Sequence, residues 1–126
     1  MDEKIGADAV ADELLRERKR QVVVEGNSRA GDDGYVRGEL VKAGICYLTN
    51  ALVWVQMLHD GMSKDVLNRK SETAGPPSLW PWAHKWWKPK GPRENLVRAG
   101  ALIIAEIERL DRAAAAEAAD QLAEAE

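Results

Sequence analysis

Residues 79–90, with the sequence LWPWAHKWWKPK, hold the side chains best suited to chemistry. The segment contains four of the chain's five tryptophans, one of its two histidines and three lysines. Tryptophan faces stack on flat rings and lysines pair with anions, so this mixture is typical of a site for a nucleobase joined to a phosphate. The candidate ligand-binding residues of this Trp/Lys/Arg cluster are Trp80, His84, Lys85, Trp86, Trp87, Lys88 and Arg93.

Packing is the competing role for the same tryptophans. The chain has no phenylalanine, so tryptophan must supply most of its large aromatic packing. Each buried tryptophan removes roughly 200 Å² from water, which is worth about 5 kcal/mol as an upper figure. A short helix between Pro81 and Pro89 would place Trp82 and Trp86 on one face at i and i+4. We therefore expect Trp82 and Trp86 to form a packing cover. The residues expected to face outward are Lys85, Lys88, and Trp80 or Trp87.

The acidic pair Asp32 and Asp33 is a second candidate site. Together with Glu39, these carboxylates would supply the oxygen ligands of a metal ion in a metal-dependent hydrolase. Helix capping needs fewer assumptions, because the pair stands just before a long apolar segment and suits the positive end of a helix dipole. We expect capping and keep the metal site as the weaker alternative.

Cys46 is the only cysteine and lies in the apolar run GICYL. We expect a buried small hydrophobe, because no histidine is placed to act as its base. A lone cysteine also fits a reducing cytosolic setting. The chain has no Walker loop, no dinucleotide-binding glycine fingerprint, no CxxC pair and no HExxH motif. The sequence therefore indicates no cofactor and favours a binding protein over an enzyme.

The first helix is expected over residues 7–24, with Val10, Leu14, Leu15 and Val22 near one face. The basic run RERKR, residues 16–20, occupies the other face. Such runs are more often solvated than bound to nucleic acid, so we expect a solvated face. A glycine-rich loop is expected over residues 25–34. The one strand candidate is QVVVEG, residues 21–26.

Two long apolar helices are expected to form an antiparallel core. The first spans residues 35–58, and the second runs from Pro92, a residue suited to the first helical position, to residue 112. Helical periodicity predicts the inward face of each. For the first helix these residues are Leu40, Ile45, Leu48, Leu52, Val55 and Met57 or Leu58, extended by Tyr47, Ala51 and Trp54. For the second they are Leu96, Val97, Gly100, Ile103, Ile104, Ile107 and Leu110.

The connections complete an all-α single domain over residues 1–112. Gly61 is expected to end the first long helix, and Ser63 to cap a short helix that ends near residue 70. The first helix should pack across the two long ones, with the Trp-rich segment closing one end. Residues 113–126, rich in alanine and glutamate, are expected to be a frayed helical extension or disordered. The helices are more apolar than one small domain needs, so we also expect a homo-oligomer.

Composition excludes several classes of protein. A chain of 126 residues fits one domain, and its net charge of −3 argues against general nucleic-acid binding. The N-terminus lacks the charged-then-apolar layout of a signal peptide. The longest apolar stretch, residues 45–58, is interrupted by Thr49, Asn50 and Gln56. We therefore expect no membrane span.

Residues 86–112, WWKPKGPRENLVRAGALIIAEIERLDR, resemble the ending of a group of small tailed-phage and prophage proteins. The WPW of residues 80–82 belongs to the same resemblance, as does an N-terminal pattern of E-R-x-x-Q, E-G, an acidic pair and G-x-L. The matching residues here are Glu17, Arg18, Gln21, Glu25, Gly26, Asp32, Asp33, Gly38 and Leu40. The chain departs from the group at Asn27, where relatives often carry tryptophan, and at Gly31 or Gly34, where they often carry histidine.

The resemblance implies a phage-encoded accessory protein that acts in the cytoplasm of a bacterial host. It implies no particular activity, and small phage accessory proteins often work by binding. Two hypotheses stay open at this point. One is a protein that holds an anionic or nucleotide-like small molecule at the Trp/Lys/Arg cluster, for example in counter-defence. The other is a protein–protein inhibitor or adaptor of a host factor.

Overall fold

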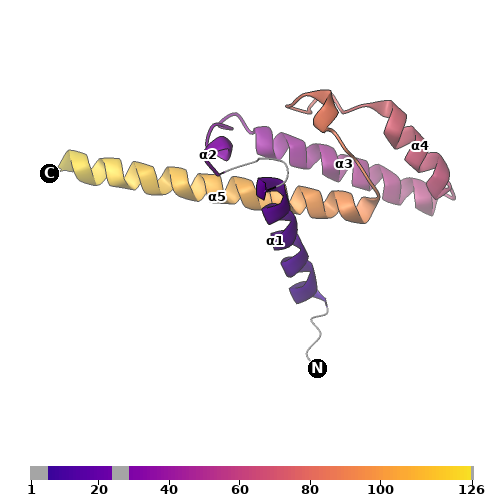
Figure 1. Cartoon of the computed structure of the whole chain (residues 1–126), viewed down its shortest axis with the longest axis horizontal. Coiled ribbons are helices and arrows are strands. Elements are labelled where there is room, and N and C mark those ends of the chain that lie inside the picture. Colours follow the sequence, from indigo (N-terminus) through magenta and orange to yellow (C-terminus); the bar gives the residue numbers. More distant parts are fainter. Residues whose placement is uncertain (1–5, 24–28, 126) are drawn as a thin grey trace.

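The computed structural model describes residues 6–23 and 29–125 and is built from helices (Figure 1). The helices are α1 (Ala7–Val23), α2 (Arg29–Asp32), α3 (Glu39–His59), α4 (Lys64–Ala74) and α5 (Pro92–Ala125), with a 3-10 turn, η1, at His84–Trp86. The described ranges contain no strand, which confirms the all-α class. Residues 21–23 of the strand candidate are the last turn of α1, while residues 24–28, including Asn27, lie outside the described residues.

α3 and α5 form the predicted antiparallel pair (Figure 1). Gly44 faces Ala99 and Leu102, whereas Asn50, later on α3, accepts a 2.7 Å hydrogen bond from Asn95, earlier on α5. The pairing therefore runs in opposite directions along the two helices. The buried residues of this pair are mostly small, and they include Ala43, Gly44, Ala51, Ala99 and Ala105. Small side chains at a helix–helix contact let the two axes approach closely.

The predicted inward faces of the two long helices are largely wrong. The buried residues are Leu40, Ala43, Gly44, Cys46, Tyr47, Ala51 and Trp54 on α3, and Asn95, Ala99, Ala101, Leu102 and Ala105 on α5. The predicted core residues that are exposed instead are Ile45, Leu48, Leu52, Val55, Met57, Leu96, Ile103, Ile107 and Leu110. Periodicity locates an apolar face but does not say which of two faces meets the other helix. Here the face of small residues does.

Glycine and serine set the ends of the middle helices. α3 begins at Glu39, later than predicted, because Gly38 has a left-handed backbone at φ 81°. It ends near Gly61 as predicted, where φ is 94° and Met62 N donates to Met57 O at 2.9 Å. Ser63 caps α4, as predicted, by accepting a 3.3 Å bond from Val66 N. That helix continues past residue 70 to Ala74.

Among the described residues, α3 is the one helix long and apolar enough to cross a membrane. The expectation of no membrane span considered only the shorter stretch of residues 45–58, and it stays a prediction. Core helices of soluble proteins pass the same test of length and composition, and 39% of the most apolar window of α3 is buried inside the fold.

α1 packs across α5, but only part of its predicted apolar face takes part (Figure 1). Val10 and Leu15 are 45% and 52% exposed. Leu14 does reach α5, where it lies against Gly100. A Cβ at Gly100 would come within 2.6 Å of Leu14 Cδ2, so glycine leaves room for the crossing.

A buried arginine holds α1 in place. Arg18 Nη2 donates to Asp32 Oδ2 of α2 at 2.7 Å, and Arg18 Nε donates to Glu108 Oε1 of α5 at 3.0 Å. Arg18 is 7% exposed, so the expectation of a fully solvated basic run is wrong at this residue. One guanidinium thus connects three helices, and it orients the side of α1 that carries Arg20 and Gln21.

The acidic pair does not cap α3. The helix has Gly38 at its N-cap position with no side-chain cap. Asp32 is fully buried against Arg18, and Asp33 Oδ1 pairs with Arg112 Nη2 at 2.8 Å. Both carboxylates therefore hold α2 against its neighbours. Burial raises the pKa of the Asp32 carboxyl even though the Arg18 hydrogen bond and charge act to lower it.

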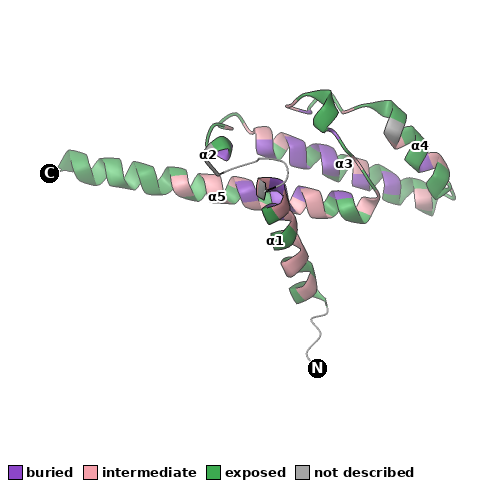
Figure 2. Cartoon of the chain, viewed as in Figure 1, coloured by how far each residue is buried: buried purple, intermediate pink, exposed green. Residues whose placement is uncertain are grey.

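Residues 113–125 continue α5 as an exposed helix that projects beyond the rest of the molecule (Figure 2). The helical form of the predicted tail is therefore the one observed. This part of α5 packs against nothing else in the described chain, a point that bears on the last inference below.

Removing the Arg18 side chain should destabilise the whole fold. Arg18→Ala leaves the buried Asp32 carboxylate without its cation, a change that typically costs about 3–5 kcal/mol. Urea unfolding followed by circular dichroism would measure this loss. Lys19→Ala, at the exposed neighbouring position, is the matched control and should change stability by less than about 0.5 kcal/mol. Equal stability of the two variants would contradict the assigned role of Arg18.

The raised pKa of Asp32 predicts a pH dependence with a definite sign. The folded protein binds a proton at this carboxyl more tightly than the unfolded chain does. The associated stability is complete below the ordinary value of 3.8 and is lost as pH rises through the folded-state pKa. Asp32→Asn cannot ionise, so the difference between its free energy of unfolding and that of the wild type should shift in favour of the variant as the pH rises from below 3.8 toward neutrality. A constant difference across that range would show that the pKa is not raised.

Candidate functional site

The Trp-rich segment, residues 79–90, crosses the α3–α5 pair with one 3-10 turn. That turn is closed by bonds of 3.0 Å from Trp86 N to Ala83 O and from Trp87 N to His84 O. The predicted helix between Pro81 and Pro89 is thus reduced to η1. Trp82 precedes this turn, so it does not form the expected i,i+4 pair with Trp86.

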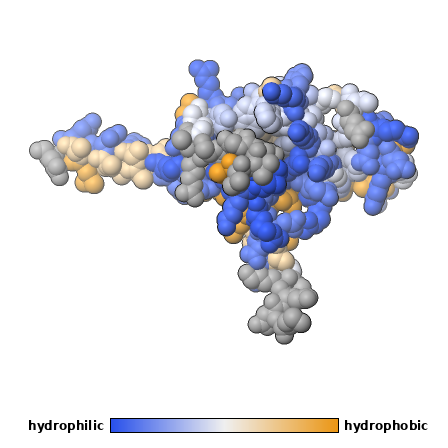
Figure 3. Space-filling view, in the orientation of Figure 1, coloured by the Kyte–Doolittle hydropathy of each residue, from blue (hydrophilic) through white to orange (hydrophobic). Residues whose placement is uncertain are grey.

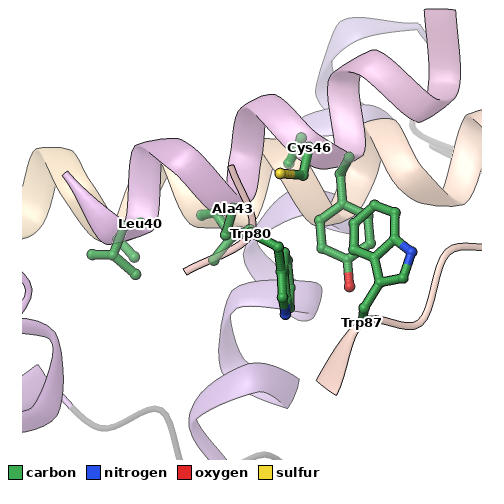
Figure 4. Close-up of a cluster of buried hydrophobic side chains, with 9 residues drawn as sticks. Leu40, Ala43, Cys46, Trp80 and Trp87 are labelled. Atoms are coloured by element: carbon green, nitrogen blue, oxygen red, sulfur yellow. The ribbon is translucent and has the colours of Figure 1, made fainter. Parts of the chain in front are cut away.

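The division of the tryptophans between core and surface differs from the prediction, except that Trp82 packs partly buried against the core as expected. Trp80 and Trp87 are each 9% exposed, while Trp86 is 47% exposed. The two buried rings pack on Tyr47 with centroid separations of 5.7 and 4.8 Å. Figure 4 shows them beneath α3, beside the side chains of buried α3 residues. Trp80 and Trp87 therefore form the packing cover. Because the expected helix is not formed, Trp82 and Trp86 do not share one face as an i,i+4 pair.

Trp82 joins this cover to a partly open aromatic cluster. Its ring centroid lies 5.3 Å from that of Trp80 and 5.4 Å from that of Tyr35. Trp80 Nε1 donates to Ala83 O at 3.2 Å. Trp82 Nε1 is also buried but has no hydrogen-bond partner among the described residues. A buried indole N–H without an acceptor is costly, so this atom is a ready donor to a bound group.

A cavity of about 330 Å³ opens between the aromatic cluster, α1 and α5. Its size lies at the small end of the range for small-molecule sites, roughly 300–1,000 Å³. Five of the chain's seven aromatic residues contribute to its walls, including both tyrosines. The lining residues are Arg20, Gln21, Tyr35, Tyr47, Trp80, Trp82, Ala83, Trp86, Arg98 and Leu102.

Two arginines make the cavity cationic at one side. Arg98 Nη1 donates to the Lys88 carbonyl oxygen, and the Arg98 guanidinium carbon lies 5.7 Å from the Tyr47 ring centroid. Arg20 makes two bonds of 2.7 Å to the carboxylate of Glu17. Burial acts to raise the pKa of Glu17, but the Arg20 hydrogen bond and the charges of Arg20 and Arg98 lower it overall. Arg98 is thus held in position by a carbonyl and a ring, whereas Arg20 already faces an ionised carboxylate.

A charged groove of about 400 Å³ adjoins the cavity and shares both arginines with it. Four cationic and three acidic side chains line the groove, together with one valine. They are Glu13, Arg16, Glu17, Arg20, Lys90, Glu94, Val97 and Arg98. The aromatic cavity therefore opens toward a polar surface on which a charged group of a ligand can remain partly solvated.

The predicted ligand-binding residues are divided by this geometry. Trp80 and Trp86 line the cavity. Trp87 packs against Tyr47 as part of the cover and does not line the cavity. Arg93 makes two bonds of 2.6 Å to Glu13, outside the cavity.

The three remaining candidates, His84, Lys85 and Lys88, are exposed, and their side chains do not line the cavity. Lys85 Nζ lies 5.2 Å from the centroid of the Trp86 ring, and the carbonyl of Lys88 accepts the bond from Arg98. His84 contributes its carbonyl to η1. These residues therefore shape the cavity wall rather than contact its interior.

Sequence reasoning missed most of the cavity's polar and tyrosine lining. Gln21 was assigned to the N-terminal pattern of the family resemblance, and Tyr47 to the inward face of the first long helix. Arg20 was assigned to the solvated basic run. One usable signal was available, because a chain without phenylalanine has few aromatic residues to place. Arg98 is the cation that the structure brings to the Tyr47 ring at the cavity wall.

The alternative metal site is not assembled. The described residues contain no group of three histidine, cysteine, aspartate or glutamate side chains placed to hold a metal ion. Asp32 and Asp33 are ion-paired, and Glu39 Oε1 accepts a 2.8 Å bond from Arg37 N. Cys46 is buried as predicted, and burial raises the pKa of its thiol, which keeps it neutral.

Comparison of the chain with protein-family models, with curated proteins and with solved structures gave no match. The resemblance to tailed-phage and prophage proteins therefore stays a prediction.

The reversed roles of the tryptophans can be tested by stability alone. Trp87→Ala removes a buried ring from the cover and should cost about 3–5 kcal/mol in the free energy of unfolding. Trp86→Ala removes a half-exposed ring and should cost well under half as much. Chemical denaturation of both variants provides the comparison. A larger loss for Trp86→Ala would restore the arrangement expected from the sequence.

Proposed function

We propose that this chain is a non-enzymatic binding protein that holds a planar, anionic, nucleotide-like ligand in the aromatic cavity. The observation that carries the proposal is the gathering of five aromatic side chains and two arginines around one space of about 330 Å³. Aromatic walls favour a flat ring by stacking, and each stacked base is worth about 1–3 kcal/mol.

The polar atoms of the cavity favour a ligand with both an acceptor and a negative charge. Trp82 Nε1 lacks a partner and offers a donor to a ring nitrogen or carbonyl. Arg98, held by the Lys88 carbonyl and the Tyr47 ring, offers a preorganised fork to a phosphate or carboxylate. Glu17 competes for Arg20, so we assign Arg98 the main anion contact.

The resemblance to tailed-phage proteins supports a biological setting for this activity. It favours a phage- or prophage-encoded accessory protein in a bacterial cytoplasm, where sequestering a nucleotide-like signal would act in counter-defence. We favour sequestration over catalysis because the cavity lining contains neither a histidine nor a carboxylate to act as a general base.

A second candidate function is inhibition or bridging of a host protein. Leu79 and Trp86 are 41% and 47% exposed on neighbouring turns of the Trp-rich segment, and tryptophan is enriched in interface hot spots. This reading uses the outer surface of the segment and needs no ligand in the cavity.

Calorimetric titration with adenosine 5′-monophosphate and the other common nucleoside monophosphates tests the proposal. At least one nucleotide should bind more tightly than both its nucleoside and inorganic phosphate. Trp86→Ala should weaken that binding by about 5- to 150-fold while the circular dichroism spectrum stays unchanged. Lys64→Ala, an exposed change on α4, is the control and should bind as the wild type does.

Arg98→Gln separates the two parts of the ligand. It should reduce the affinity for the nucleotide toward that for the nucleoside, because the anion contact is lost. Absence of binding by every nucleotide would contradict the proposal. So would wild-type affinity in the Trp86→Ala variant. Capture of a host protein that depends on Trp86, without nucleotide binding, would favour the second candidate.

A further inference from the structure

The largest aliphatic side chains of α3 and α5 form two regular exposed stripes. On α3 they follow steps of four, three, four and three residues, and each is 39–56% exposed. The same steps describe α5, except that its second position is Gly100, against which Leu14 of α1 packs. The stripe residues are Val41, Ile45, Leu48, Leu52 and Val55 on α3, and Leu96, Ile103, Ile107 and Leu110 on α5.

Both stripes lie on the same side of the α3–α5 pair. Tyr47 and Leu102 line the cavity, so they mark the side of each helix that the Trp-rich segment covers. Leu48 follows Tyr47, and Ile103 follows Leu102. Each stripe therefore lies about 100° further around its helix than the covered residue, beyond the interhelical contact. Because the helices are antiparallel, equal turns bring both stripes to the side of the pair opposite the cover. The result is one apolar face built by two adjacent helices.

This face has the size and composition of an interface core. Nine aliphatic side chains, each about half exposed, present on the order of several hundred Å² of apolar surface. That is the scale of the largest patch on a typical monomer, and it approaches the roughly 800 Å² per partner of a standard interface. Residues 43–58 of α3 contain no charged side chain. Depletion of charge is the compositional mark of an interface centre.

We propose that a second copy of this chain covers the face, so that α3 and α5 of both copies form a four-helix bundle. A twofold interface needs a patch that is complementary to itself. Two antiparallel helices with the same three- and four-residue steps meet that need, because each stripe can interdigitate with its counterpart at a shallow crossing angle. Leu40 and Leu102 are buried, but the nine large aliphatic side chains of the stripes lie outside, which suits a bundle of two copies better than an isolated hairpin.

The composition of α5 argues against a membrane as the occupant. Helices that lie on anionic lipid surfaces carry lysine and arginine on their polar face. α5 instead carries more carboxylates than cations along its length. Its exposed end, residues 113–125, also projects as a single helix (Figure 3). Isolated helices of this length are marginal in water, and the next stripe position there is Ala114, which lets another helix approach.

Sedimentation velocity of the full chain over a range of concentrations tests the proposal, and the wild type should sediment as a dimer. Leu52→Glu buries a carboxylate twice in the twofold interface and should raise the dissociation constant on the order of 100-fold. Val53→Glu is the matched control. It introduces the same charge at the next residue of α3, which is 42% exposed but off the stripe, and should leave the dimer intact.

Each alternative result has a definite meaning. A wild-type monomer at every concentration overturns the proposal, as does equal dissociation of the Leu52→Glu and Val53→Glu variants. Flotation of a monomeric wild type with phosphatidylglycerol vesicles would assign the face to a membrane instead. If Leu52→Glu fails to fold, the melting temperature of the wild type decides, because only a dimer's rises with protein concentration.

Discussion

The contact between α3 and α5 is made by small residues, and much of the structure depends on this constraint. Gly44 lies against Ala99 and Leu102, and Ala43, Ala51 and Ala105 are also buried, so the two backbones lie close together and leave little room between them for large side chains. Apart from the buried Leu40 and Leu102, most of the large aliphatic side chains of both helices are therefore displaced to the outside. A pair packed in this way buries little apolar surface by itself, and it needs cover on both sides.

The Trp-rich segment provides that cover on one side. Trp80 and Trp87 pack against Tyr47, which projects from α3 and also faces the guanidinium of Arg98 on α5. Large flat rings on a surface of small residues do not fill it completely, and the cavity is the space that remains. α1 closes the third wall, and its position depends on the buried Arg18 contacts with Asp32 and Glu108. The candidate site is therefore a consequence of the packing and is shared by three parts of the chain.

Local signals in the sequence were sufficient for the framework of the fold. Pro92 marks the start of α5, Gly61 lies just past the end of α3, and Ser63 caps α4, because each acts through its own backbone or the next turn. Those signals do not identify contacts between distant residues. Arg18 lies within a basic run whose composition predicts a solvated face. The cost of burying its charge is offset only by the ion pairs with Asp32 and Glu108.

The same limit explains the errors at the candidate site. Trp80 and Trp86, two of the predicted ligand-binding residues, line the cavity, but the assignment of Trp82 and Trp86 to the core relied on a helix that is only η1. The inward faces of α3 and α5 were misassigned because hydrophobicity ranks leucine and isoleucine above alanine. Close packing between these two helices favours the smaller residues at the contact instead. The proposed second copy of the chain would bury the leucines and isoleucines of the stripes.

Native mass spectrometry of the purified chain during titration with a nucleoside monophosphate is the most direct test of this packing account. Small residues inside leave the cavity on one side of the helix pair and the proposed dimer face on the other. The expected result is therefore a dimer that takes up two nucleotides, one for each cavity. A monomer that takes up none would contradict it.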